Sequence, residues 1–385
     1  MRTNFTPQQL ADPRIAEAEK SLRTCVHCGI CTATCPTYVL LGDERDGPRG
    51  RIVMIQQMLE EGGAPSPDAV THIDRCLSCL ACRSACPSSV DYARLIDAAR
   101  AHVETHHRRP LGERLLRWLI ANVMTRSALV RAGLMLAPLG QWLPGRLGAM
   151  ARVGARARPR AGTLARGEGR RVGLLRGCVQ QALAPEIDAA VSRVLARRGI
   201  ALVPLDADCC GALVHHLGRD ASAFSERVAA AAQGFDEVLI TATGCSAYLK
   251  EISAKARDLL ELVDARGRAP RRLRVAWQAP CSLQNGLRLA DKGRQLLLDC
   301  GYEVLDVPEG HLCCGSAGSY AILQPEIAAE LRARKLGNIA RLKPDVIATA
   351  NIGCLHHLSE GGIPIVHYAA LVDWADGGAA PDFLR

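Results

Sequence analysis

Apolar positions recur at helical spacing through the first hundred residues. Between residues 52 and 59 they fall on one face of a helix that follows a Gly-Pro-Arg-Gly turn. Thr6, with Gln9 three positions later, has the form of a capping box and predicts a helix start there. No pattern of strand type interrupts these helical patterns. Residues 1–100 are therefore predicted to form an all-helical domain.

A second zone, residues 101–171, contains no cysteine. Its amphipathic segments at 115–123 and 129–136 predict helices with an apolar stripe. Such a stripe usually packs against a core, and the alternative is that it docks onto a partner subunit or a membrane surface. The zone ends in a Gly/Ala/Pro-rich stretch that is interpreted as a linker. Its seven arginines are Arg152, Arg156, Arg158, Arg160, Arg166, Arg170 and Arg171.

Residues 172–385 alternate short β-rich runs with helical patterns. Strands that alternate with helices predict parallel α/β units, and the order of the elements repeats once. We predict two α/β domains, 172–272 and 273–385, each with a parallel sheet, so that the chain has the class α + α/β. The β-rich runs lie at 172–175, 238–241, 275–277 and 346–349.

Cysteine content adds chemistry to this outline, because the chain has 17 cysteines in 385 residues. The N-terminal segment is polar and lacks the apolar run of a signal peptide, and no stretch reaches the ~18 apolar residues of a membrane span. We therefore expect a cytoplasmic protein whose thiols bind metal rather than form disulfides. The formal charge of +9 is compatible with binding to nucleic acid or to an anionic membrane surface. Most of the excess positive charge lies in the linker, which argues against binding to nucleic acid.

The helical domain contains two cysteine runs of the form C-x2-C-x2-C-x3-C-P. Three thiols two residues apart can bind three irons of a 4Fe-4S cube from one loop, whereas the fourth, before proline, diverges. In two-cluster ferredoxins, which these runs resemble, that fourth cysteine ligates the other cluster. Zinc motifs instead usually have two C-x2-C pairs separated by a finger. We expect two 4Fe-4S clusters: site 1 with Cys25, Cys28, Cys31 and Cys86, and site 2 with Cys76, Cys79, Cys82 and Cys35.

Each α/β domain carries four cysteines in the same order: one after a β-run, an adjacent pair followed by glycine, and one after a later β-run. Ligands of open α/β sheets gather at the carboxyl ends of the strands, so each domain can bring four thiols to one point. Gly211 and Gly315 lack a Cβ where the chain must approach a cluster closely. Cys300 stands alone and is expected to be an ordinary buried side chain. The sets are site 3, with Cys178, Cys209, Cys210 and Cys245, and site 4, with Cys281, Cys313, Cys314 and Cys354.

These motifs carry a resemblance to known families. The segments CVHCGICTATCPTYVLLGDERDGPRGRI, HLCCGSAGSY and TANIGC, together with the domain order, closely resemble the glycolate oxidase iron–sulfur subunits over nearly the whole chain. The helical domain resembles the ferredoxin module of respiratory dehydrogenase subunits. The α/β domains resemble the cysteine-rich CCG domains of heterodisulfide reductases and lactate-utilisation proteins, which hold iron–sulfur clusters.

The resemblance implies a role and its partners. A separate flavin subunit would oxidise glycolate to glyoxylate, and this chain would pass the electrons to a membrane quinone or another respiratory acceptor. The iron–sulfur subunits of anaerobic glycerol-3-phosphate dehydrogenase share the architecture and are the near alternative, with lactate dehydrogenase as another. A heterodisulfide-reductase-like cluster enzyme is the third alternative.

One departure from the CCG pattern bears on that last alternative. The full pattern ends in C-x2-C and gives five thiols to each domain, but Ala242 and Asn351 occupy the first of those two positions. Four thiols suffice for an ordinary cubane, so one or two further clusters are expected in the α/β domains. The missing thiols argue against disulfide chemistry at a five-thiol cluster.

Motifs for a hydride acceptor are missing from the sequence. No G-x-G-x-x-G follows a strand and opens a helix, and no Walker A pattern occurs, so we expect no flavin or NAD on this chain and no catalytic residue. For the pairs His215–His216 and His356–His357 packing near a cluster is favoured over acid–base catalysis. Three single residues are candidates for setting the reduction potential of a cluster: His311, Arg49 and Arg51. The two arginines are equally well interpreted as solvated surface charges.

Overall fold

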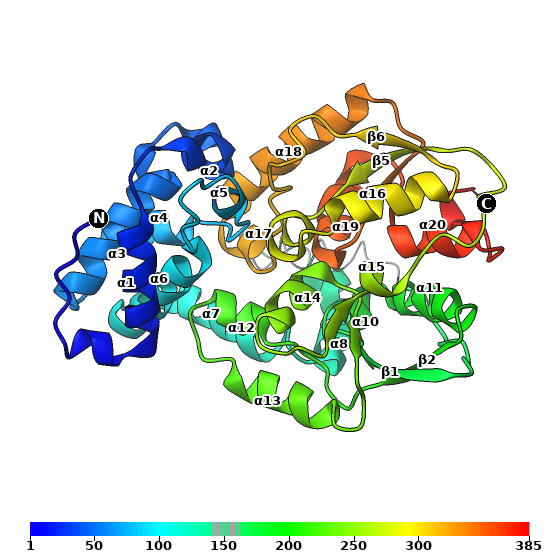
Figure 1. Ribbon diagram of the computed structural model, residues 1–385, viewed down its shortest axis with the longest axis horizontal. Coiled ribbons are helices and arrows are strands. Elements are labelled where there is room, and N and C mark those ends of the chain that lie inside the picture. The colour runs from blue at the N-terminus through cyan, green and yellow to red at the C-terminus, as the bar shows by residue number, and fades with distance from the viewer. Residues whose placement is uncertain are drawn as a thin grey trace.

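The computed structural model describes residues 1–140, 142, 148, 151, 154, 159–160 and 162–384. A helical domain forms one end of the molecule, and two α/β domains lie side by side at the other (Figure 1). Before residue 170, the described part of the chain contains helices and no strand. The expected fold class, a helical module followed by two α/β domains with parallel sheets, is confirmed.

The helical domain packs α1, α3, α4 and α6 around one apolar core that includes Leu22, Ile55 and Leu95. The expected helix start at Thr6 is wrong by several residues. Thr6 and Gln9 do exchange hydrogen bonds, but they close only a 3-10 turn, and α1 begins at Pro13 with Asp12 as its cap. The elements are η1 (Gln9–Ala11), α1 (Pro13–Thr24), η2 (Ile30–Thr34), α2 (Pro36–Leu41), η3 (Glu44–Asp46), α3 (Pro48–Glu61), α4 (Pro67–Asp74), α5 (Ala81–Ser84) and α6 (Tyr92–His106).

The connector contains α7 (Leu111–Asn122) and α8 (Ser127–Gly140). On α7, Leu116 and Ile120 are buried against the first α/β domain, as expected for a packing stripe. On α8 the apolar surface is largely exposed: Met135 is 76% and Leu139 is 79% accessible. None of the helices in the described part of the chain combines the length and the hydropathy needed to cross a bilayer.

The arginine-rich linker is shorter than expected. Arg152, Arg156 and Arg158 lie outside the described residues. Arg170 and Arg171 do not belong to a linker, because the first strand begins at Arg170. The backbone of these two arginines pairs with a neighbouring strand, and such pairing overrides the local composition.

The first α/β domain has a four-stranded parallel sheet in the order β2-β1-β3-β4. Strands β1 and β3 match two of the expected runs, and β2 and β4 were not anticipated. The elements are β1 (Arg170–Leu175), α10 (Gln180–Leu183), α11 (Pro185–Ala196), β2 (Ile200–Pro204), α12 (Ala212–His216), α13 (Ser222–Ala231), β3 (Val238–Ile240), α14 (Thr243–Lys250), β4 (Ala256–Asp258) and α15 (Leu259–Leu262).

The second α/β domain repeats this topology, with its strands in the order β6-β5-β7-β8. The repetition agrees with the internal repeat seen in the sequence. The elements are β5 (Arg274–Gln278), a π-helical turn η4 (Ser282–Leu287), α16 (Ala290–Asp299), β6 (Glu303–Asp306), α17 (Tyr320–Leu323), α18 (Pro325–Arg341), β7 (Val346–Thr349), α19 (Ile352–Leu358), η5 (Ser359–Gly361), β8 (Ile365–His367), α20 (Tyr368–Ala375) and η6 (Asp382–Leu384).

The strand order explains why the cysteines gather. In each sheet the first strand of the domain lies in the middle, between the second and the third, so the chain leaves it in opposite directions on its two sides. The loops that follow these three strands meet at one carboxyl edge, which is the preferred ligand position in such sheets. Sites 3 and 4 are drawn from these loops.

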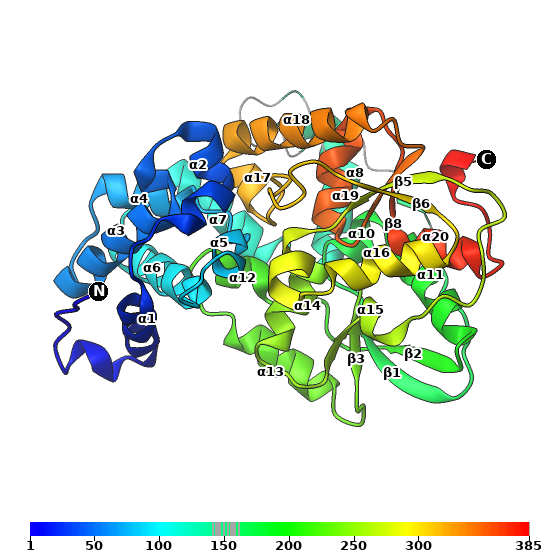
Figure 2. The ribbon, with the colours of Figure 1, turned by 45° about the horizontal axis from the view of Figure 1, so that its top comes forward.

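Contacts between domains place the sites relative to one another. The two α/β domains share one continuous apolar core, and Asp373 of α20 pairs with Arg193 and Arg197 on the first α/β domain. Helix α18 of the second α/β domain lies against α2 of the helical domain (Figure 2). The second α/β domain therefore contacts both other domains.

Candidate iron–sulfur centres

All 17 cysteines are free thiols, and most are buried. In site 3 the Sγ atoms of Cys178 and Cys209 are 3.5 Å apart, well beyond the ~2.05 Å of a disulfide. Their hydrogen bond raises the pKa of Cys178 and lowers that of Cys209. Hydrogen bonds with Cys209 and Cys245 raise the pKa of Cys210. The four thiols thus form one contact group, and their assignment to a shared metal centre stays a prediction.

Site 4 has the same arrangement in the second α/β domain. The Sγ atoms of Cys281 and Cys313 are 3.9 Å apart, and those of Cys314 and Cys354 are 3.4 Å apart. The cysteines that the sequence places far apart are therefore adjacent in space. A group of largely buried thiols suits a soft metal or an iron–sulfur cluster.

The glycine after each adjacent pair is required by the backbone. Gly211 and Gly315 have φ angles of +88° and +94°, which glycine adopts most readily. A Cβ on Gly315 would lie 2.6 Å from the carbonyl oxygen of Ala328, and one on Gly211 would lie 2.9 Å from Cβ of Phe224. Both glycines let the chain turn tightly after the paired thiols. The atoms that an added Cβ would meet belong to neighbouring protein segments, and the expected close approach to a cluster stays a prediction.

Site 1 lies at the surface of the helical domain. Cys25, Cys28, Cys31 and Cys86 line one small cavity. Burial and the charges of Cys25 and Cys86 raise the pKa of Cys31. Cys28 is the one cysteine in the chain that is exposed.

Site 2 lies deeper in the same domain. Burial raises the pKa of Cys82, and the charges of Cys79, Cys76 and Cys35 raise it further. Cys86 therefore lies with the first run and Cys35 with the second, which is the exchange seen in two-cluster ferredoxins. The assignment of these thiols as cluster ligands stays a prediction.

The two runs share a backbone shape that sequence reasoning did not reveal. His27 and Ser78, at equivalent positions, have φ angles of +56° and +50°. Gly29 and Leu80, also equivalent, have φ angles of +79° and +57°. Left-handed conformations at non-glycine residues are costly and persist where the surroundings demand them. The two runs therefore share a left-handed backbone at both equivalent positions.

Site 2 touches site 4 across the domain boundary. Burial and then the charge of Cys281 raise the pKa of Cys79, and both cysteines pack against one apolar cluster that contains Leu77 and Cys313. Asn285 clamps this contact: its Nδ2 donates to the carbonyl oxygen of Cys79 at 2.8 Å, and its Oδ1 accepts from Ser84 Oγ at 2.8 Å. The helical domain therefore meets the second α/β domain at cysteine-bearing loops.

Sites 3 and 4 are joined by a direct contact between their loops. The amide of Thr243 donates to the carbonyl of Ala350 at 3.3 Å, and Ser282 Oγ donates to Thr243 Oγ1 at 2.8 Å. At the two positions without a fifth thiol, Ala242 is buried in the shared core and Asn351 Oδ1 caps α19 by accepting from the Gly353 amide. Both residues thus have structural roles at positions where the full CCG pattern has a cysteine.

The histidine pairs show packing roles. His215 Nε2 lies 3.0 Å from a carboxylate oxygen of Asp97, and burial lowers the pKa of His216 to about 4. His357 Nε2 lies 3.1 Å from the carbonyl oxygen of Ala328, and burial lowers the pKa of His356. His311, which the sequence suggested as a tuning residue, is exposed to solvent.

Two buried cations beside the thiols are functional candidates. Lys335, which sequence reasoning missed, is 2% exposed. Burial lowers its pKa, against the opposing charges of Cys314, Cys313 and Cys354 of site 4. Lys335 lies on the buried face of α18 together with Leu331. A lysine within the apolar stripe of this helix was the sequence feature that could have revealed it.

Arg51 is the second buried cation, and it resolves the alternatives left open for the two arginines. It is 1% exposed, and its Nη1 lies 3.8 Å from Cys35 Sγ of site 2. Arg49 is more accessible and pairs with Glu44 at 2.7 Å. It lies beside Gly29 in the site 1 loop.

Comparisons with known proteins agree with this architecture. Residues 21–90 match the family of 4Fe-4S dicluster domains, and residues 172–250 and 275–359 match the family of cysteine-rich domains. The chain is 40% identical to the glycolate oxidase iron–sulfur subunit of Escherichia coli strain K12, over 97% of this chain and 99% of that protein.

More distant relatives extend over similar lengths. The chain is 28% identical to a probable glycolate oxidase iron–sulfur subunit of Bacillus subtilis strain 168, covering 93% of this chain and 95% of that one. It is 24% identical to one of the subunits of fumarate reductase (CoM/CoB) from Methanothermobacter marburgensis, covering 95% and 75%. The identity and near-complete coverage of the first relative are decisive for the assignment. The chain belongs to the family of glycolate oxidase iron–sulfur subunits.

Proposed function

We propose that this chain is the electron-relay subunit of a complex that oxidises glycolate to glyoxylate on a separate flavin subunit. The electrons would continue to a respiratory acceptor such as a quinone. When bound, 4Fe-4S clusters supply one-electron carriers whose potentials the protein sets. The proposal is supported by 40% identity, over almost the full length, to a protein named as the iron–sulfur subunit of glycolate oxidase.

The observation that carries the proposal is the continuous order of the four thiol sets. Site 1 opens to solvent at Cys28. Cys82 of site 2 lines the same cavity as the four thiols of site 1, and Cys79 of site 2 and Cys281 of site 4 pack against the same apolar cluster. The loops of sites 4 and 3 are hydrogen-bonded through Ser282 and Thr243. This series of centres is what an electron relay requires.

The chain's own residues in this proposal hold, insulate and position the clusters. Cys28 at the surface marks the edge at which a redox partner exchanges electrons with site 1. Apolar side chains pack around the thiols of sites 2 and 4. We propose that the two-electron oxidation of the hydroxy acid takes place on the flavin subunit, and that this chain carries no flavin or NAD.

The complex is proposed to act in the cytoplasm, with peripheral contact to the membrane. The exposed apolar residues Met135, Leu136 and Leu139 of α8 support this. Between Glu113 and Glu168 the sequence contains arginines and no acidic residue. An exposed apolar face combined with positive charge favours an anionic bilayer surface.

Other donors are the alternative that remains for this architecture. Glycerol 3-phosphate or lactate would be oxidised on a partner subunit, and the residues described here act on the relay rather than on the donor. Heterodisulfide chemistry is not proposed, because Ala242 and Asn351 have replaced the fifth thiols.

The test is anaerobic co-expression of the chain with candidate flavin subunits, followed by purification. We expect a flavoprotein to co-purify and the iron–sulfur absorbance to bleach when glycolate is added. Cys28→Ala should abolish site 1 and slow the bleaching, whereas Cys300→Ala, outside every thiol set, should leave iron content unchanged. Bleaching by glycerol 3-phosphate alone would favour the alternative donor. Glycolate oxidation by the isolated chain would contradict the relay.

A further inference from the structure

Arg51 is held rigidly against the thiols of site 2. Its Nε donates to the carbonyl oxygen of His72 at 2.7 Å, and its Nη2 donates to Thr37 Oγ1 at 3.1 Å. Its Nη1 faces Cys35 Sγ at 3.8 Å. A guanidinium is not deprotonated in proteins, so Arg51 carries a permanent positive charge inside this domain.

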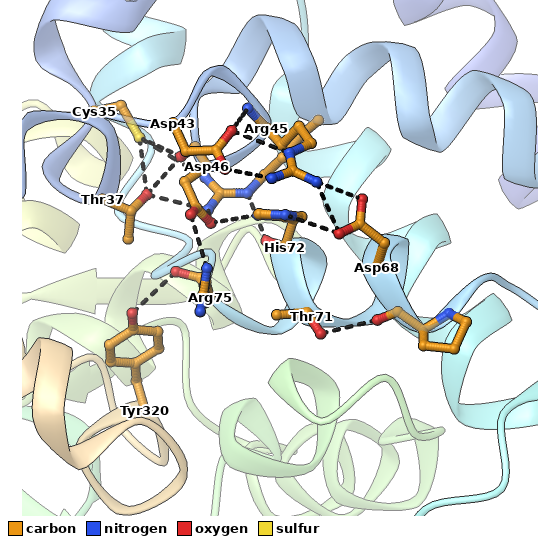
Figure 3. A network of polar contacts seen from close by, with 12 residues as sticks. Cys35, Thr37, Asp43, Arg45, Asp46, Asp68, Thr71, His72, Arg75 and Tyr320 are labelled. Carbon is orange, nitrogen blue, oxygen red and sulfur yellow. Dashed lines mark hydrogen bonds and ion pairs between the residues drawn. The ribbon is translucent and has the colours of Figure 1, made fainter. Parts of the chain in front are cut away.

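The counter-charge of Arg51 is shared with other groups. Asp46 is fully buried, and its Oδ1 lies 3.4 Å from Arg51 Nη2 and 2.8 Å from His72 Nδ1. Its Oδ2 accepts from Arg75 Nη1 at 3.0 Å (Figure 3). One carboxylate thus faces two arginines. Arg45, Asp43 and Asp68 join this network through His72, so its arginines and aspartates balance in formal charge. Arg51 is the cation of the network that lies against Cys35 of site 2.

This polar network is not a metal site, although Asp43, Asp46 and His72 lie close enough together to suggest one. Asp43 forms an ion pair with Arg45 at 2.7 Å, and the Asp46 carboxylate is occupied by arginine (Figure 3). A divalent cation would have to displace these guanidinium groups. The network is compensated within the protein, and its function is better sought in its effect on Cys35.

Arg49 provides an internal comparison two residues away. It faces the site 1 loop at Gly29. Its side chain is 40% exposed and paired with Glu44, which is 42% exposed. Water and salt screen an exposed charge far more than a buried one. Arg49 and Arg51 thus carry the same charge beside neighbouring sites, but solvent screens the charge of Arg49 and not that of Arg51.

We propose that Arg51 is a positioning residue that raises the reduction potential of the site 2 cluster above that of site 1. Reduction adds one negative charge to a cluster, and a buried positive charge beside its sulfur ligand stabilises that form. Electrons arriving at the surface centre are then drawn inward to site 2 and its neighbour, site 4. The inference rests on the proposed relay function and on the assignment of Cys35 to site 2.

The test is a potentiometric titration of the full-length chain, followed by electron paramagnetic resonance, with iron content measured beside it. Arg51→Gln should lower the equilibrium constant for reducing one cluster at least tenfold, which is about 59 mV for a one-electron couple. Arg51→Lys should keep most of the wild-type reduction potential. Arg49→Gln should change the other potential less, and its effect should vanish at high salt. Cys28→Ser assigns the signals, because it changes the site 1 spectrum alone.

Two outcomes would overturn the proposal. One is an Arg51→Gln protein with full iron content and unchanged potentials, and the other is an equal shift from Arg49→Gln. If Arg51→Gln does not retain its iron, Asp46→Asn replaces it as the test. That change keeps Arg51 and removes its counter-charge, so the site 2 potential must rise, and a fall or no change refutes the proposal. Absence of two clusters in the wild type would instead contradict the proposed function.

Discussion

Replacing Gly315 by alanine tests whether the backbone around site 4 is as constrained as the structure indicates. The residue has a φ of +94°, and an added Cβ would lie 2.6 Å from the carbonyl oxygen of Ala328 on α18. A left-handed alanine costs about 1–2 kcal/mol. Overpacking against a helix backbone, which cannot move as a side chain can, costs about 1–3 kcal/mol. The expected loss is therefore about 2–5 kcal/mol, a large part of a typical folding free energy.

The matched control is Gly337→Ala on the exposed face of the same helix. A Cβ there meets no atom within 4 Å, and alanine favours a helix by about 0.5–1 kcal/mol over glycine. Thermal unfolding of the two variants should shift the midpoint in opposite directions, and Gly315→Ala should also lose iron from site 4. A Gly315→Ala protein with the wild-type midpoint and full iron content would refute the reasoning.

Three further predictions concern single side chains. Asn285→Ala removes both hydrogen bonds between domains at Cys79 and Ser84 and should destabilise the chain by about 1–3 kcal/mol in urea unfolding; an unchanged midpoint would argue against the clamp. Lys335→Met removes the buried cation beside site 4 and should lower only that potential in a redox titration. Burial lowers the pKa of His367 from 6.5 to about 4, so between these pH values the unfolded chain binds more protons than the folded chain. The free energy of unfolding should therefore fall as the pH drops from 6.5 toward 4. His367→Asn keeps an acceptor for the Ala369 amide and should flatten this pH dependence; a variant with an equally steep dependence would contradict the prediction.

Spacing along the chain was enough to predict the architecture and the grouping of the thiols. Cysteine order and β-rich runs are local signals, so the central strands β1, β3, β5 and β7 and the sets at sites 3 and 4 could be anticipated. Strands β2, β4, β6 and β8 were missed. They lie at the outer positions of the sheets, where partial exposure weakens the continuous apolar run that marks a buried strand.

Contacts between distant residues could not be derived from pattern alone. Arg51 and Arg49 look alike in the sequence, and only the packing of α3 against the loop of Cys35 buries one and exposes the other. Lys335 of α18 donates to the carbonyl oxygens of Glu309 and Gly310 and lies near enough to the thiols of site 4 for their charges to act on its pKa. The meeting of Cys79 with Cys281 likewise depends on how domains dock, which no local spacing encodes.

The most direct test of the account is the metal content of the full-length chain purified without air. We expect a brown protein with about eight iron atoms and as many acid-labile sulfides for sites 1 and 2, and more where sites 3 and 4 are filled. Mössbauer spectra should show 4Fe-4S clusters. A colourless protein that contains zinc and no iron would contradict the central claim that this polypeptide holds a series of electron carriers.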